Sequence, residues 1–223
     1  MSARDEILGT VRRSLGAAHD DAARRATVEA RIAAGAPGLR PSRGQGDVDA
    51  RSATFAYEAQ RVNATFERVA SLDLVPGAAA RFLRERILAA HLRMGEDLRL
   101  DTMPWAATQV DITRGPSAGN DLNAISFAEA AVAETGTLVF VSGPHNPTTL
   151  NFLPDNHIAV VRAADVEADY EAVWARLRER FGKGILPRTV NFVTGPSRSA
   201  DIEQKMLLGA HGPRSLHIIM VDA

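Results

Sequence analysis

One segment of the sequence combines residue types that bind anions. A strand-like run ends at Thr194 and leads through a Gly-Pro turn and an arginine into a stretch predicted as a helix over Ala200–Leu208. Ser199 is the expected N-cap, the free N–H groups of a helix start attract anions, and Arg198 could clamp a carboxylate or phosphate. The alternative is an ordinary helix start with an exposed arginine. The predicted ligand-binding residues of this segment are Thr194, Gly195, Ser197, Arg198, Ser199 and Asp201.

A carboxylate stands in a second turn. In Ala133-Glu134-Thr135-Gly136-Thr137, a glycine two residues after an acid precedes a β-branched run, which predicts a tight turn that enters a strand. Glu134 would lie at the loop tip, where it can act as a general base, as a nucleophile toward an acyl group or as a ligand clamp. Thr135 and Gly136 count as ligand-binding candidates. The alternative is a solvated turn acid without chemistry.

Two histidines are candidates for proton transfer near neutral pH. His157 opens a predicted strand, and His211 lies in a loop that contains glycine and proline. No metal-ligand spacing such as His-Glu-x-x-His occurs, so no metal site is predicted, and a single histidine is more often structural. The sequence lacks a Gly-x-Ser-x-Gly elbow, a Gly-x-x-x-x-Gly-Lys loop and a Gly-x-Gly-x-x-Gly fingerprint. Their absence argues against a serine hydrolase, ATP binding and dinucleotide binding.

Short runs rich in β-branched residues must position these side chains. They cover residues 137–142, 157–163, 189–194 and 216–222, and their lack of strict alternation is typical of strands buried on both faces. A helix from about Asp165 is predicted between the second and third runs, and the Ala200–Leu208 helix between the third and fourth. Two strand–helix–strand units in series predict parallel pairing and an α/β fold.

The first and third of these runs end in the same way. Residues 137–144 (TLVFVSGP) match residues 189–196 (TVNFVTGP) at six of eight positions, when Ser142 and Thr194 are counted as equivalent. If the two strands are parallel, both Gly-Pro turns lie at the carboxyl edge of the sheet, where open α/β sheets bind ligands. Coincidence is the alternative, because such turns are common after strands.

The N-terminal half predicts an arm and the start of the compact domain. An amphipathic helix is expected over residues 3–15, a weaker helix over 20–34 and a Gly/Pro/Ser/Arg-rich linker over 35–49. We therefore divide the chain into an N-terminal helical arm with a flexible linker, 1–50, and an α/β domain, 51–223. Apolar stripes at helical spacing over 55–69 and 82–92 predict two helices, with 72–75 as a candidate strand between them.

Composition excludes several classes of protein. The sequence has no cysteine, which removes disulfides, thiolate-held iron–sulfur clusters, zinc–thiolate sites and thiol nucleophiles. A formal net charge of −1 gives no electrostatic footprint for nucleic acid. The sequence has no apolar run long enough to span a membrane and no signal-peptide pattern at its start, so we expect a cytoplasmic protein.

Several motifs in order resemble one family. Residues 133–137 (AETGT), 153–158 (LPDNHI), 195–203 (GPSRSADIE), 209–213 (GAHGP) and the closing strand are similar to the LUD domain of the lactate utilisation protein C (LutC/YkgG) family. The resemblance implies a NagB/RpiA/CoA-transferase-like fold, a mostly parallel sheet flanked by helices. It also implies a role in the oxidation of L-lactate to pyruvate together with iron–sulfur partner proteins. This chain itself would carry no cofactor.

These observations lead to one hypothesis and two rivals. The first is a component of L-lactate utilisation that binds a small carboxylate- or phosphate-bearing ligand at the carboxyl edge of the sheet, with Glu134, His157 and His211 as candidate catalytic residues. The second is an independent enzyme of the acyl/CoA-transferase or cyclo-ligase type that uses Glu134. The third is a non-catalytic scaffold subunit.

Overall fold

The structure is a computed structural model and describes residues 2–16, 21–202 and 205–222. The chain divides into two units, residues 1–39 and residues 40–223. The first unit holds helices α1 (Ala3–Ser14) and α2 (Ala22–Ala34), in neither of which a described residue is buried. Ser2 and Asp5 form a capping box on α1, and Gly35 ends α2 in the left-handed conformation with φ 54°.

The second unit is built on a six-stranded parallel sheet. Its order is β1-β12-β7-β4-β2-β3, and every neighbouring pair is parallel. The strands are β1 (Thr65–Val69), β2 (His91–Met94), β3 (Asp111–Arg114), β4 (Asn123–Phe127), β7 (Asn156–Arg162) and β12 (Ser215–Val221). The predicted α/β fold with a mostly parallel central sheet is confirmed.

A second sheet lies against one face of the first. Its order is β8-β5-β6-β9, with β5 parallel to β8 and β6 antiparallel to both β5 and β9. The strands are β5 (Ala130–Val132), β6 (Thr137–Val141), β8 (Val166–Glu167) and β9 (Val190–Val193). The Gly-Pro turns after β6 and β9 therefore lie at opposite ends of this sheet, so the expectation that both share one edge is wrong.

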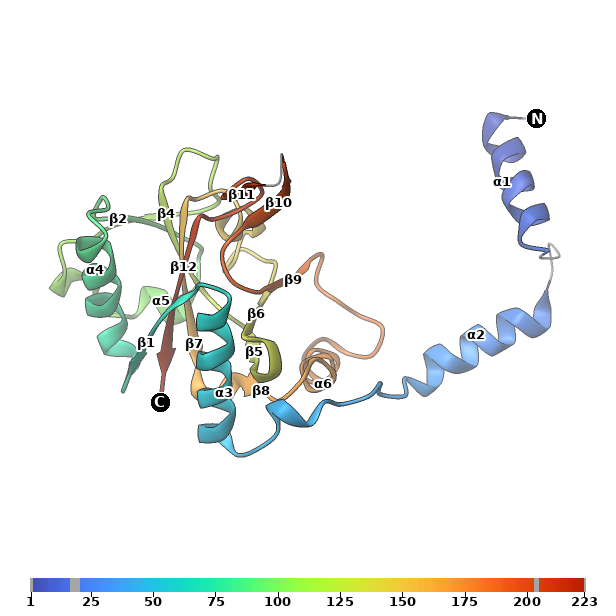
Figure 1. Ribbon diagram of the computed structural model, residues 1–223, viewed down its shortest axis with the longest axis horizontal. Coiled ribbons are helices and arrows are strands. Elements are labelled where there is room, and N and C mark those ends of the chain that lie inside the picture. The colour runs from blue at the N-terminus through green and yellow to red at the C-terminus, as the bar shows by residue number, and fades with distance from the viewer. Residues whose placement is uncertain (1, 17–20, 203–204, 223) are drawn as a thin grey trace. The chain divides into compact units, whose positions relative to one another are not determined.

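Helices complete the layers (Figure 1). Helix α4 (Val75–Glu85) covers one face of the large sheet, α3 (Val48–Arg61) packs on the other face beside the small sheet, and α6 (Tyr170–Phe181) covers the outer face of the small sheet. The short helices are α5 (Leu98–Asp101) and the 3₁₀ turns Ser42–Gly44, Leu72–Leu74, Trp105–Ala107, Ala133–Thr135, Thr148–Asn151 and Ala163–Asp165.

Strand β7 shows why the predicted strands lack alternation. Ile158 and Val160 pack in the layer with α4, whereas Ala159 and Val161 pack in the layer between the two sheets. Both faces of the strand are buried, so both sets of positions are apolar.

Three elements predicted between residues 55 and 92 differ from the observed ones. The stripe over 55–69 runs past the end of α3 at Arg61, where Asn63 takes the left-handed φ of 68°, and its last residues belong to β1. Likewise α4 ends at Glu85, and the end of the 82–92 stripe lies in β2. Residues 72–74 form a 3₁₀ turn instead of a strand.

The largest correction concerns the predicted helix over Ala200–Leu208. This segment is an antiparallel hairpin of β10 (Arg198–Ile202) and β11 (Lys205–Leu208), in which Arg198 pairs with Leu208. The Gly209 N–H continues the pairing by donating to the Ser197 carbonyl at 3.0 Å. The backbone hydrogen bonds thus run across the hairpin, and no helix start with Ser199 as its N-cap is formed.

Candidate functional site

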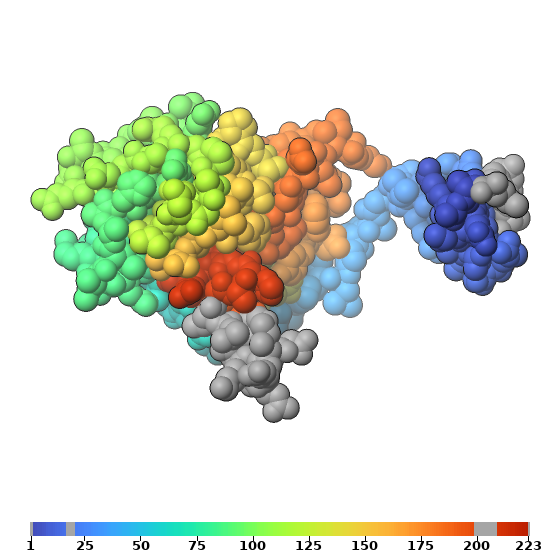
Figure 2. Space-filling model, turned by 90° about the horizontal axis from the view of Figure 1, so that it is seen from above, coloured from blue at the N-terminus to red at the C-terminus, as the bar shows by residue number. Residues whose placement is uncertain are grey.

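The predicted anion-binding segment lines a cavity of about 380 Å³, which we call the amino-edge cavity. Its walls come from residues 151–152 before β7, residues 192–198 around the end of β9, and residues 211–213 before β12. Because β7 and β12 begin just after these wall segments, the cavity lies at the amino ends of the parallel strands. The predicted cleft at the carboxyl edge is therefore wrong for these residues. Figure 2 looks onto this end, where the amber surface near residue 150 borders the red C-terminal segment.

Glycine at position 195 lets the wall approach helix α3 closely. Gly195 has φ +73°, and a Cβ there would lie 2.5 Å from the Val62 carbonyl oxygen. The exposed Arg198 donates from Nη2 to the same carbonyl at 3.0 Å. This oxygen lies at the C-cap of α3, the negative end of the helix, which favours a guanidinium. Arg198 has five N–H donors, so others can reach a ligand.

Ser197 joins this wall to the loop before β12. Its N–H donates to the Pro213 carbonyl at 2.8 Å, and its hydroxyl accepts from the His211 N–H at 3.2 Å. A Cβ on Gly212 would lie 3.3 Å from the Ser197 Cβ. The Ser197 side chain thus holds the loop in place, and this loop puts the exposed His211 on the cavity lining.

Thr194 connects the cavity to a cluster of hydroxyl groups. Its Oγ1 lies 2.7 Å from that of the buried Thr137, which lies 2.7 Å from Thr135 Oγ1 and 3.0 Å from the Tyr170 hydroxyl. Tyr170 also lies 3.2 Å from Thr135 Oγ1. Thr137 and Tyr170 were not among the predicted site residues. The available signal was the Thr-x-Thr spacing, which puts both hydroxyls on one side of the strand entry.

Glu134 does not line the amino-edge cavity. The residue is 4% exposed, its Oε2 lies 3.9 Å from Nε of Arg43, and its backbone N–H donates to the Ala168 carbonyl at 3.3 Å. Gly136, with φ +64°, brings the same turn against the backbone of Ala59 in α3. The structure brings Thr135 toward Thr194 but turns Glu134 to the 3₁₀ turn Ser42–Gly44. The solvated-acid alternative is also wrong, because the side chain is buried.

His157 is enclosed between the two sheets. Its ring centre lies 5.3 Å from that of Phe140, the residue is fully buried, and neither ring nitrogen has a hydrogen-bond partner among the residues the structure describes. Burial lowers the pKa of His157 from 6.5 to about 4, so the ring is neutral at pH 7. His157 is not brought to the cavity lining with His211.

Sequence reasoning did not single out His217, a second buried histidine. It stacks on Phe82 at 4.3 Å and lies 2.8 Å from the Thr65 hydroxyl. Burial, followed by the charges of Arg86 and Arg81, lowers its pKa to about 4. Both histidines therefore stay uncharged in the folded protein at neutral pH.

Two further predicted residues lie on β10. Ser199 and Asp201 follow Arg198 in this strand, but their side chains lie outside the described part of the structure. The predicted site is thus partly assembled. The residues brought together around the cavity are Thr194, Gly195, Ser197, Arg198 and His211.

The carboxyl edge of the large sheet carries charges that satisfy one another. Asp97 accepts two side-chain hydrogen bonds from Arg99, at 2.6 and 2.9 Å, and the Arg99 guanidinium lies 4.1 Å from the centre of the Phe127 ring. The buried Glu129, just after β4, pairs with Arg180 of α6. These acids pair with arginine side chains, whereas Arg198 is exposed on the cavity lining and its side chain donates to the backbone carbonyl of Val62.

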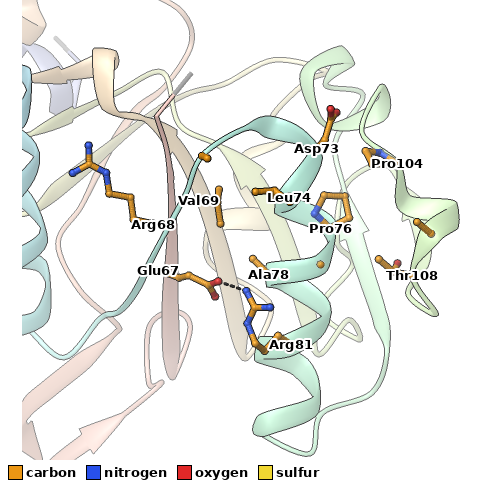
Figure 3. A pocket seen from close by; sticks show the side chains of 13 residues that line it. Glu67, Arg68, Val69, Asp73, Leu74, Pro76, Ala78, Arg81, Pro104 and Thr108 are labelled. Atoms are coloured by element: carbon orange, nitrogen blue, oxygen red, sulfur yellow. Dashed lines mark hydrogen bonds and ion pairs between the residues drawn. The ribbon is translucent and has the colours of Figure 1, made fainter.

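A cavity of about 500 Å³ lies between β1, the start of α4 and the loop at Pro104 (Figure 3). The Arg81 guanidinium on its wall is turned toward Glu67, with which it forms an ion pair. Arg68 also lines this cavity and pairs with Asp222 and Asp49, so both cationic side chains on the wall already have acidic partners. In the ranges 2–16, 21–202 and 205–222, no group of three or more potential metal-binding side chains is found. No helix in those ranges is long and apolar enough to cross a membrane.

Most of the chain matches the model of one protein family. The model described as "LUD domain" matches residues 52–221. A solved structure of a DUF162 family protein from Deinococcus radiodurans has a TM-score of 0.59 and 23% identity, and the match covers 79% of this chain and 99% of that chain. The structural likeness concerns the fold and agrees with the α/β architecture.

Several curated proteins are similar in sequence. Lactate utilization protein C of Geobacillus thermodenitrificans is 39% identical over 100 residues, which are 44% of this chain and 42% of that protein. The protein of the same name from an Exiguobacterium species is 29% identical over 178 residues, 75% of this chain and 76% of the relative. The chain thus spans about two fifths of the first relative and three quarters of the second. The resemblance noted from the motifs is confirmed.

Proposed function

Because the chain belongs to the LUD-domain family, we propose that it is a component of L-lactate utilisation that binds a small carboxylate in the amino-edge cavity. The observation that carries the proposal is Arg198, which is exposed on the cavity lining and oriented by the Val62 carbonyl. The name of the relatives, lactate utilization protein C, supports lactate or its oxidation product pyruvate as the ligand.

The chemistry of the wall supports a carboxylate. Arg198 supplies a charge-assisted, planar donor that matches the two oxygens of a carboxyl group. Thr194 contributes a hydroxyl, and its contact with Thr137 keeps this hydroxyl in place. His211 is exposed on the cavity lining, where its imidazole is within the walls that would surround a ligand. These groups bind and orient a ligand.

Oxidation of L-lactate to pyruvate removes two electrons and two protons, so a complete system needs an electron acceptor. Cysteine thiolates are the usual ligands of iron–sulfur clusters, and this sequence has none. We therefore place the clusters in partner proteins and assign the handling of the carboxylate to this chain. The partners are expected to accept the electrons.

The test is a calorimetric titration of the purified protein with L-lactate, pyruvate and phosphate. Arg198→Ala should weaken carboxylate binding by about tenfold to a hundredfold, the loss of one charge-assisted hydrogen bond. The matched control is Arg188→Ala, because Arg188 is also an exposed arginine but does not line the cavity. Equal affinity in wild type and Arg198→Ala would remove Arg198 from the site. Binding of phosphate in preference to both acids would reassign the ligand class.

A further inference from the structure

The inner wall of the amino-edge cavity holds a buried amide that lacks a partner. Asn151 ends the 3₁₀ turn Thr148–Asn151, lines the cavity and is fully buried. Its Oδ1 accepts from the Ser126 hydroxyl at 3.3 Å, whereas its Nδ2 has no hydrogen-bond partner within the described part of the chain. A buried N–H donor without an acceptor is unfavourable, and native structures seldom keep one without a reason.

The surroundings of Asn151 fix its orientation. The turn is closed by the Leu150 N–H, which donates to the Pro147 carbonyl at 2.9 Å, and Thr149 Oγ1 accepts from the Ser117 N–H at 3.1 Å. Ser126 lies on β4, an inner strand of the large sheet, so the amide oxygen is anchored to the sheet itself. With the oxygen occupied by Ser126, the NH₂ group is the end of the side chain left for a ligand.

The cavity therefore has two donors of different kind, a guanidinium on its exposed rim and a neutral amide on its buried wall. We propose that Asn151 is the specificity-determining residue of this site and donates from Nδ2 to the oxygen on carbon 2 of a short 2-hydroxy or 2-oxo carboxylate. This inference rests on the proposed function, in which Arg198 holds the carboxyl group. The amide NH₂ group donates hydrogen bonds and accepts none, so it pairs with a keto oxygen or with a lone pair of a hydroxyl oxygen.

This assignment makes a prediction about selectivity. Propionate has the carboxyl group and the three carbons of lactate and pyruvate but lacks the oxygen on carbon 2. In the wild type, propionate would leave Asn151 Nδ2 unpaired, so it should bind about three- to tenfold more weakly than pyruvate, the value of one neutral hydrogen bond. Sites that hydrogen-bond a ligand group reject the analogue without it for this reason.

The experiment is a titration of L-lactate, pyruvate and propionate into the wild type, Asn151→Ala and Asn151→Asp. Asn151→Ala should bring the affinity ratio of pyruvate to propionate close to one, while binding of both acids stays dependent on Arg198. Asn151→Asp keeps the acceptor for Ser126 but replaces the donor with a carboxylate, so it should bind every acid more weakly than Asn151→Ala. A thermal unfolding scan of each variant shows whether it is folded.

The outcomes separate this inference from the proposed function. If the acids bind through Arg198 but the ratio of pyruvate to propionate is the same in the wild type and Asn151→Ala, the role of Asn151 is refuted and the carboxylate site stands. If the wild type binds none of the acids, both proposals are wrong. Should Asn151→Ala be unfolded, Ser126→Ala takes its place, because it frees the amide oxygen and should reduce the same ratio. An unchanged ratio in folded Ser126→Ala would then overturn the inference.

Discussion

Replacing Gly195 by alanine tests how the wall of the amino-edge cavity is built. The substitution carries two separate costs. An L-residue in the left-handed region costs about 1–2 kcal/mol, and the new Cβ would lie 2.5 Å from the Val62 carbonyl oxygen. Overlap of this kind in a packed site costs typically about 1–3 kcal/mol. Together they lower the free energy of unfolding by about 2–5 kcal/mol.

Gly184 offers a matched control for this substitution. Its φ is +78°, close to that of Gly195, but a Cβ there meets nothing within 4 Å. Gly184→Ala should therefore show only the backbone cost, about 1–2 kcal/mol. Because Arg198 donates to the same Val62 carbonyl, Gly195→Ala should also weaken carboxylate binding, whereas Gly184→Ala should leave it unchanged.

Urea denaturation of the three proteins, followed by circular dichroism, measures both effects on stability. Equal slopes of the unfolding free energy against urea are needed before the midpoints are compared. If the two alanine variants lose the same stability, the close approach of Gly195 to α3 does not exist in solution. The reasoning that places Arg198 at the end of α3 would then be refuted as well.

Two further predictions concern the layers behind the cavity. Burial lowers the pKa of His157 from 6.5 in the unfolded chain to about 4 in the folded one. Between these two pH values the unfolded state binds one proton more than the folded state. Through this residue alone, the free energy of unfolding should therefore fall by about 2 kcal/mol from roughly pH 7 to pH 5. His217 has a similarly lowered pKa and should add a loss of the same size. His157→Leu should therefore remove about half of the combined pH dependence in urea titrations, and an unchanged slope would contradict the burial of the ring. Tyr170→Phe removes a hydroxyl that is hydrogen-bonded to two threonines and should lower the free energy of unfolding by about 1 kcal/mol. The control Tyr57→Phe, at an exposed position, should lower it hardly at all. Equal losses of stability in thermal unfolding would argue against the hydroxyl cluster.

The strands of the C-terminal half could be predicted from the sequence because strands buried on both faces are short, continuous runs of apolar and β-branched residues. The runs at 137–142 and 157–163 agree with β6 and β7 to within one residue at each end. The pairing could not be predicted in the same way. β9 follows helix α6 as in a parallel unit, but it pairs antiparallel with β6 in a different sheet. Nothing local in 189–194 distinguishes these two arrangements.

The predicted helix ends, and the helix predicted where the hairpin lies, were wrong for a related reason. Apolar residues of β1 continue the spacing of the α3 stripe by chance, and only the left-handed Asn63 marks the end of the helix. The segment 198–208 has a plausible helix pattern, yet its backbone is paired across the hairpin. Strand pairing decided the outcome in both places: β1 pairs with the distant β12, and β10 pairs with the neighbouring β11.

The candidate site was partly predictable. The hydroxyl, glycine and arginine types in 194–198 pointed to anion chemistry, and the loop with His211 lies beside them. Asn151 could not be found, because a single asparagine in a turn forms no motif and its significance depends on burial and on Ser126. Glu134 was misplaced because its turn is pressed against α3 by Gly136, a contact between distant segments.

Chemical-shift mapping would test the central claim most directly. Pyruvate would be titrated into ¹⁵N-labelled protein while the backbone amides of both edges of the large sheet are followed. We predict saturable shifts at Gly195, Arg198 and Gly212 around the amino-edge cavity, with Gly95 and Gly115 at the carboxyl edge unchanged. Shifts confined to Gly95 and Gly115 would contradict the account and place the ligand at the opposite edge.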